Sequence, residues 1–433
     1  MGVPETFINY KKDSNMDLTM RNQSGQNQAV HSPPRCGVSR RIAAARPLAT
    51  TAMHERVDLL KSQGKRVIDF SIAISHFPAP AQVRAAVRSA LEEPLLPYTA
   101  VSGLPALRGK LAAKLQGENR IDAEARHLIV TNGAKQALYQ SLYVMTDPGD
   151  TAIVLRPHWP AYVATAQLLD LDIVLADQPA VVDAAFLDGL PRARVLVINN
   201  PHNPTGKVYT PAELECIRAW LRARGTACII DESYEKLVFD GEHQSLAACP
   251  DWETLGIVTV FSASQSYAMM GWRAGFACAP ASWIKAMEAL QGPITAAVPA
   301  LTQVAAGAAF AIGAVPDLLA DYRARRDMVV RMFAPVPWIS MAAPASGPYL
   351  WGDISALTRD TAAFAETLID EYRVAIMPGE ALGCPGFIRI GYIADDEATL
   401  RRGVAAIIAL GNRLAAAHGA AVPPSGLSSL AAG

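Results

Sequence analysis

The chain has 433 residues, 51% of them apolar, and its 39 Lys and Arg residues nearly balance its 40 Asp and Glu residues. A chain of this length and composition can bury a large core, as two domains or as one large domain with a lobe. The near-zero net charge, with only a short basic group at Arg40, Arg41 and Arg46, argues against nucleic acid or a membrane surface as partner.

The cysteines and the apolar segments indicate the cell compartment. The six cysteines are scattered without a CxxC pair, no histidine stands at metal-ligand spacing, and the N-terminus lacks an apolar signal core. We therefore expect a cytoplasmic protein with free thiols and no metal site. The Ala-rich stretch 296–314 comes closest to a membrane span, but Pro299, Gln303 and Gly307 interrupt it, so it predicts a buried helix.

In chain order, the first predicted segment is a flexible N-terminal extension over residues 1–38. It is rich in Asn, Gln, Ser and charge and has few large apolar side chains to offset the entropy of ordering. From Ser39 the pattern becomes helical, with Met53, Val57 and Leu60 at spacings of four and three. Gly64 ends this helix, and a short strand is predicted at 67–70.

The middle of the chain alternates short apolar runs with helical segments, one of which begins at Ala134. The predicted strands are 127–130, 151–155, 195–198, 227–230, 257–261 and 274–277. Continuously apolar strands separated by helices predict a three-layer α/β sandwich with a mostly parallel sheet covered on both faces. Such sheets bind ligands beyond the carboxyl ends of their strands.

The last part of the chain predicts a smaller α+β domain. Strands are expected at 347–351 and 387–390, with a helix from Thr361 between them. The predicted organisation is a large domain over 76–324 and a small domain formed by 39–75 together with 325–433.

Polar motifs stand at the predicted strand ends. They read Asn-Pro-His-Asn-Pro-Thr-Gly at 200–206, Asp-Glu-Ser-Tyr at 231–234, Ser-Ala-Ser-Gln at 262–265 and Gly-Trp-Arg-Ala-Gly at 271–275. An Asn-Pro-Thr-Gly turn alone is an ordinary loop. In this order and at these separations, the motifs resemble the signature of fold-type I pyridoxal 5'-phosphate (PLP) enzymes, specifically the class I and II aminotransferases related to aspartate aminotransferase. The resemblance covers roughly residues 39–415.

An anion site is predicted where Gly133, Ala134 and Lys135 follow a strand and open a helix, because free backbone N–H groups and the helix dipole favour negative charge there. A simple helix start is the plainer interpretation. The resemblance implies that this site binds the PLP phosphate and that Ser262, Ser264 and Arg273 complete it. It also implies that Tyr98 reaches the phosphate of a partner subunit, in a homodimer with composite sites.

The resemblance assigns the cofactor ring to a second group of residues. Asp231 would hold the proton on the ring nitrogen, which makes the ring a better electron sink. Asn203 and Tyr234 would hydrogen-bond its phenolic oxygen, and Trp159 would stack on the ring, although a lone Trp is more often a core residue.

Arg389 lies in an apolar strand, where a guanidinium without an anion would be costly to bury. The resemblance implies that its anion is the α-carboxylate of an amino acid or 2-oxo acid substrate, bound in bidentate fashion. An ion pair with an Asp or Glu of the chain is the alternative.

Gln265 is the main departure from the family pattern, because it occupies the position of the Schiff-base lysine that binds PLP covalently and moves the substrate proton. A carboxamide nitrogen is neither nucleophilic nor basic. We therefore expect PLP, or pyridoxamine 5'-phosphate, to be held without a covalent bond and turnover to be strongly impaired. We favour a replacement made to trap a bound intermediate. The alternative is a natural lysine-free enzyme in which Tyr234, His202 or His76 moves protons.

A second departure lies at 71–77, where relatives commonly read Gly-Glu-Pro-Asp-Phe from position 73 and this chain has Ala73 and, further on, His76. Ala73 would narrow the loop over the substrate, and His76 adds a titratable group, although a loop histidine more often faces solvent. This favours a specialised substrate. An oxidase, cyclase or dehydratase on the same fold, and an amino acid or PLP sensor, remain the alternatives to an aminotransferase.

Overall fold

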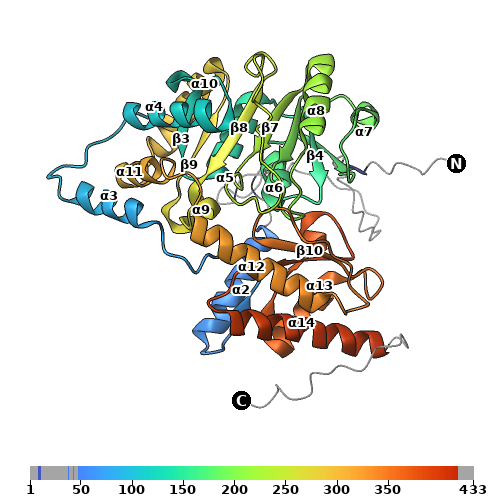
Figure 1. Ribbon diagram of the computed structural model, residues 1–433. Coiled ribbons are helices and arrows are strands. Elements are labelled where there is room, and N and C mark those ends of the chain that lie inside the picture. The colour runs from blue at the N-terminus through green and yellow to red at the C-terminus, as the bar shows by residue number, and fades with distance from the viewer. Residues whose placement is uncertain (1–7, 11–37, 39–41, 43–46, 418–433) are drawn as a thin grey trace, which may run out of the picture.

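The computed structural model describes residues 8–10, 38, 42 and 47–417. Its centre is an eight-stranded sheet in the order β1-β5-β4-β6-β7-β8-β9-β3 (Figure 1). The strands are β1 (Ile8–Tyr10), β3 (Leu128–Thr131), β4 (Thr151–Arg156), β5 (Asp172–Asp177), β6 (Val195–Asn199), β7 (Ala227–Asp231), β8 (Ile257–Ser262) and β9 (Gly275–Cys278). The five from β5 to β8 are parallel, whereas β9 runs antiparallel to both of its neighbours and β1 antiparallel to β5.

The sheet is covered by helices on both faces. Within β7, Cys228 and Ile230 pack into one core and Ala227 and Ile229 into the other, which is why this strand is apolar throughout. The first core contains α3 (Ala81–Leu91), α4 (Pro105–Lys114), α7 (Ala184–Gly189), α8 (Pro211–Arg224) and α11 (Ala300–Ala309); the second contains α5 (Ala134–Met145), α6 (Pro160–Leu168) and α10 (Ala281–Thr295). The predicted three-layer α/β fold is confirmed.

A second lobe lies below the large sheet in Figure 1. Its strands are β10 (Tyr349–Asp353), β13 (Phe387–Gly391) and β12 (Met377–Pro378) in one sheet, and β2 (Ile68–Asp69) beside β11 (Val374–Ala375) in another. Its helices are α2 (Ala49–Ser62), α12 (Pro316–Phe333), α13 (Thr361–Tyr372) and α14 (Glu397–Ala417). Because β2 pairs with β11, residues near the start of the folded chain lie in the same lobe as its last part. The predicted domain boundary at residue 325 falls inside α12. The domain limits stay a prediction.

Short turns complete the described chain: η1 (Leu115–Asn119), η2 (Ala125–His127), α9 (Ala263–Ser266), η3 (Met270–Trp272) and η4 (Gly379–Leu382). Among the described residues, no helix combines the length and the apolar character needed to cross a bilayer.

Three details differ from the sequence predictions. Strand β5 has no predicted counterpart, although its residues Ile173 to Ala176 are apolar and buried. Strand β1 forms inside the segment predicted to be a flexible extension; the rest of that segment, apart from Val38, lies outside the described residues. The buried helix predicted over 296–314 is shorter, because the backbone turns at Ala296 (φ 54°) and α11 starts only after Pro299.

Candidate active site

The carboxylate of Asp231 lies at the carboxyl end of β7 and is buried. Its Oδ1 accepts hydrogen bonds from the backbone N–H (3.0 Å) and the hydroxyl (2.5 Å) of Ser233, and its Oδ2 accepts one from the hydroxyl of Tyr162 (2.9 Å). Burial raises the pKa of Asp231, while these three hydrogen bonds act in the opposite direction. The carboxylate is therefore held rigidly at the sheet edge, where a cationic ligand would stabilise its charge.

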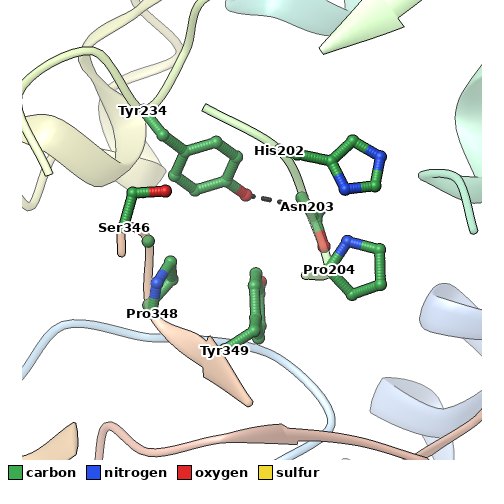
Figure 2. Close-up of a pocket in the computed structure, with 8 residues that line it drawn as sticks. His202, Asn203, Pro204, Tyr234, Ser346, Pro348 and Tyr349 are labelled. Atoms are coloured by element: carbon green, nitrogen blue, oxygen red, sulfur yellow. Dashed lines mark hydrogen bonds between the residues drawn. The ribbon is translucent and has the colours of Figure 1, made fainter. Parts of the chain in front are cut away.

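Asn199, at the end of β6, ties the neighbouring loop to this point. Its side-chain N–H donates to the backbone carbonyl of Asp231 (2.6 Å), and its oxygen accepts from the backbone N–H of Asn203 (2.6 Å). The amide of Asn203 in turn donates to the hydroxyl of Tyr234 at 3.4 Å (Figure 2). Burial raises the pKa of Tyr234 well above its usual value, so Tyr234 keeps its proton at neutral pH. Two hydrogen-bonding side chains thus converge next to Asp231.

The predicted anion site at the start of α5 is built around Gly133 and Arg273. Gly133 has a positive φ of 79°, which favours glycine, and a Cβ there would lie 2.5 Å from Nη2 of Arg273, so a side chain at this position would displace the guanidinium. Arg273 donates to the carbonyls of Met270 (2.9 Å) and Asn132 (3.2 Å) and to the hydroxyl of Ser264 (3.4 Å). No Asp or Glu of the described chain neutralises this cation, which leaves its charge available to an anion.

Backbone donors complete this anion site. The N–H of Gly133 is bonded to the carbonyl of Thr131 (2.8 Å), which leaves those of Ala134 and Lys135, in the first turn of α5, to face an anion. Ser262 caps the short helix α9 by accepting from the N–H of Ser264.

Trp159 contacts one residue of the anion site and one neighbour of Asp231. The ammonium of Lys135 lies over its ring at 5.5 Å from the centroid, and its other neighbour is Tyr162, with ring centroids 5.5 Å apart. Burial, and to a lesser degree the nearby Arg273, lowers the pKa of Lys135. Through Tyr162, this half-buried tryptophan is connected to the carboxylate of Asp231.

Arg389 projects from β13 with only 2% of its surface exposed. Its guanidinium donates to the side-chain oxygen of Asn203 (3.2 Å) and the carbonyl of Ser71 (2.6 Å) and lies 4.0 Å from the ring centroid of Tyr349. Its Nε is buried without an acceptor, and no Asp or Glu among the described residues lies within ion-pair distance. The intramolecular ion pair that the sequence left open is thus not found in the described chain, and the arginine remains without an anion.

Gln265 lies in α9 and contacts the loop that follows β2. Its amide N–H donates to the carbonyl of Ala73 (3.1 Å), while its oxygen Oε1 is buried without a donor among the described residues. The N–H of Ala73 points to the hydroxyl of Tyr349 (3.4 Å), the same ring that lies against Arg389. The structure therefore brings Gln265, Ala73 and Arg389 into one connected group.

Two predicted site residues lie outside this group. Tyr98 is fully exposed in the single chain. His76 is half-buried against α12, with its Nε2 3.3 Å from Nη2 of Arg325 and 3.5 Å from Oδ2 of Asp321. Burial, followed by the charge of Arg325, lowers the pKa of His76. Its neighbours are therefore α12 and not the residues around Gln265, and it does not face open solvent.

The sequence motifs did not reveal Tyr162, Asn199 and Tyr349, which hold Asp231, Asn203 and Ala73 in place. Beside Tyr349 is a narrow pocket that is open on one side (Figure 2). It is lined by His202, Asn203, Pro204, Tyr234, Ser346, Gly347, Pro348 and Tyr349. His202 donates to or accepts from the hydroxyl of Thr205 (2.7 Å), and burial lowers its pKa to about 3, so its imidazole is neutral at physiological pH.

Known structures share this architecture. The aspartate aminotransferase of Thermus thermophilus solved with maleate superposes with a TM-score of 0.80 at 30% identity, covering 86% of this chain and 99% of the other. The aspartate aminotransferase from Rhizobium meliloti gives a TM-score of 0.81 at 27% identity, over 87% and 99% of the two chains. The fold is therefore that of the aspartate aminotransferase-like α/β proteins.

The sequence comparisons agree with the structural ones. The family model for aminotransferase class I and II matches residues 65–407. An aspartate aminotransferase of Streptomyces avermitilis is 34% identical over 85% of this chain and 95% of its own length, and an aspartate/prephenate aminotransferase of Thermus thermophilus is 33% identical over 83% and 95%. The chain belongs to the class I and II aminotransferases.

This family implies PLP as cofactor, and the site can be tested for its fit. The guanidinium of Arg273, beside Gly133 and the first turn of α5, would bind a phosphate, and the buried carboxylate of Asp231 would accept a hydrogen bond from a protonated ring nitrogen. The N–H at Nε of Arg389, which has no acceptor among the described residues, would donate to a carboxylate. Among the described residues, none of these three groups has an oppositely charged partner, which the corresponding part of a cofactor or substrate would supply, so the residues fit the cofactor.

Proposed function

We propose that this chain is a PLP-dependent aminotransferase-like enzyme for an α-amino acid and a 2-oxo acid, in a form that lacks the Schiff-base lysine because Gln265 stands in its place. The observation that carries the proposal is that the guanidinium groups of Arg273 and Arg389 have no counterion among the described residues, while the carboxylate of Asp231 is buried at the carboxyl end of β7.

Each group of residues would have a separate role. The first turn of α5, with Ser262, Ser264 and Arg273, would bind the phosphate. Asp231 would hold a proton on the ring nitrogen, and the hydroxyl of Tyr234 and the amide of Asn203 would bind the phenolic oxygen. When bound, the cofactor supplies an electron sink for the bond that is broken at the substrate Cα.

Substrate binding would depend on Arg389 and on the loop at Ala73. Arg389 would bind the α-carboxylate through Nε and the N–H groups that Asn203 and Ser71 do not occupy, while the loop carrying Ala73 and His76 would cover the substrate. Tyr98 would bind the phosphate of the partner in a homodimer, which accounts for a tyrosine left fully exposed in one chain.

Gln265 would limit this chemistry. A carboxamide can neither attach the cofactor covalently nor accept the substrate proton, and loss of a positioned acid or base lowers rates by about 100- to 10,000-fold. Gln265 is either a replacement that traps a bound intermediate or a natural feature of a lysine-free enzyme. Tyr234 would be the proton carrier in the second case, because His202 is buried as the neutral imidazole behind it and His76 lies against α12.

The test is to restore the lysine with Gln265→Lys, record the absorbance after addition of PLP, and assay a panel of amino acids with 2-oxo acids. Gln265→Met, which also lacks an amine, is the matched control. Transamination only by the lysine variant supports the trapped enzyme. Turnover by the unchanged chain equal to that of the lysine variant indicates a natural lysine-free mechanism. Such a mechanism would include the oxidase, cyclase and dehydratase alternatives. Cofactor binding without turnover in both would indicate a sensor, and no cofactor binding in either would refute the proposal.

A further inference from the structure

The side-chain amide of Gln265 has a defined orientation. The carbonyl of Ala73, 3.1 Å away, can only accept a hydrogen bond, so the nitrogen of the amide must face it. The oxygen Oε1 therefore points away from Ala73, and it is buried without a donor among the described residues. A buried acceptor without a donor is rare in folded proteins and calls for an explanation.

No donor of the described chain lies within hydrogen-bond distance of Oε1. The hydroxyl of Tyr349 accepts from the N–H of Ala73, and Arg389 donates to Asn203 and Ser71 while its Nε has no acceptor among the described residues; neither residue donates to Oε1. Lysine side chains do not supply the proton either: Lys114 is paired with Glu235 at 2.5 Å, Lys207 with Glu213 at 2.6 Å, and Lys135 lies over Trp159. A ligand bound in this site would supply the missing donor.

We infer that Oε1 of Gln265 accepts a hydrogen bond from the ammonium group of pyridoxamine 5'-phosphate, and that this chain binds the amine form of the cofactor in preference to the aldehyde form. The inference rests on the proposed function, because it takes position 265 to lie beside the carbon that a lysine would attack. An ammonium donates to Oε1, whereas the oxygen of an aldehyde would place a second acceptor against it. With lysine at this position the preference would be the reverse, since an amine reacts with the aldehyde and repels the ammonium.

The experiment compares three ligands by isothermal titration calorimetry: pyridoxamine 5'-phosphate, PLP, and 4'-deoxypyridoxine 5'-phosphate, which carries neither an amine nor an aldehyde. The protein should bind pyridoxamine 5'-phosphate at least tenfold more tightly than the deoxy compound. It should bind PLP no more tightly than it binds the deoxy compound. Gln265→Met should abolish this preference and leave the affinity for the deoxy compound within about threefold.

Gln265→Glu is the matched second variant, because it keeps an acceptor for the ammonium but loses the donor to Ala73. It should retain the preference for the amine, which separates the acceptor role of residue 265 from its contact with the loop.

The outcomes distinguish this inference from the proposed function. If none of the three ligands binds, the proposed function fails. If all three bind with equal affinity, or if PLP binds most tightly and a lysine adduct appears after borohydride reduction, the proposed function stands and the inference is overturned. Binding of free amino acids that is weakened by Gln265→Met would also overturn it, because the donor would then be the substrate ammonium.

Discussion

Replacing Arg389 with methionine should separate a ligand-binding role from a structural one. The change leaves the oxygen of Asn203 and the carbonyl of Ser71 without their donor, at about 1–3 kcal/mol for each buried acceptor. It also removes the contact with the ring of Tyr349, worth about 0.5–2 kcal/mol. The variant, however, no longer buries a charge without a counterion, which in folded proteins costs several kcal/mol. We therefore expect the free energy of unfolding to change by less than about 2 kcal/mol.

The effect on carboxylate binding should be much larger. Removing one partner of a buried ion pair costs about 3–5 kcal/mol, which corresponds to a Kd weakened by roughly 150- to 5,000-fold. The assay is calorimetric titration of a 2-oxo acid into protein saturated with pyridoxamine 5'-phosphate, with urea denaturation run in parallel. Arg389→Lys is the control, because it keeps the charge but loses the bidentate fork. Its Kd for the 2-oxo acid should fall between those of the unchanged protein and of Arg389→Met. A Kd for Arg389→Met within threefold of the unchanged protein, with a loss of stability above about 4 kcal/mol, would show that Arg389 is structural.

Two further predictions concern the anion site and acid stability. Gly133→Ala should displace the guanidinium of Arg273 and so weaken binding of pyridoxamine 5'-phosphate at least tenfold, while binding of unphosphorylated pyridoxamine stays unchanged. Gly64→Ala is the control, because its φ of 77° is similar but its surroundings are open, and it should affect neither ligand. If Gly133→Ala weakens both ligands equally, the phosphate assignment is refuted. Burial lowers the pKa of His202 to about 3 and of His243 to about 4. Between about pH 4 and 6.5 the unfolded chain therefore binds more protons than the folded one. The free energy of unfolding thus rises with pH, by up to about 1.4 kcal/mol per pH unit for each histidine. Urea denaturation of His243→Gln between pH 4.5 and 6.5 should show a shallower slope than the unchanged protein, and an identical slope would contradict this origin.

The sequence predicted the parallel sheet well because its strands are buried on both faces. A strand such as β7, with Cys228 and Ile230 in one core and Ala227 and Ile229 in the other, has no polar position to interrupt it. Strand β1 could not be found this way, because its place is set by pairing with β5 and not by a pattern of its own.

The candidate site was predictable only where residues belong to contiguous motifs. Asp231, Asn203 and Arg273 are carried by such motifs, whereas Tyr162 and Tyr349 reach the site from a helix and a strand whose positions depend on how the elements pack. The contact between Gln265 and Ala73 joins residues 192 positions apart, and no local spacing encodes it.

A crystal structure grown with pyridoxamine 5'-phosphate is the most direct test of this account. We expect the pyridine ring between Trp159 and the end of β7, its nitrogen at the carboxylate of Asp231, its phosphate at Arg273 and the first turn of α5, and its amine at Gln265 without a covalent bond. A ring bound elsewhere, or a phosphate held away from Arg273, would contradict the assignment of this site.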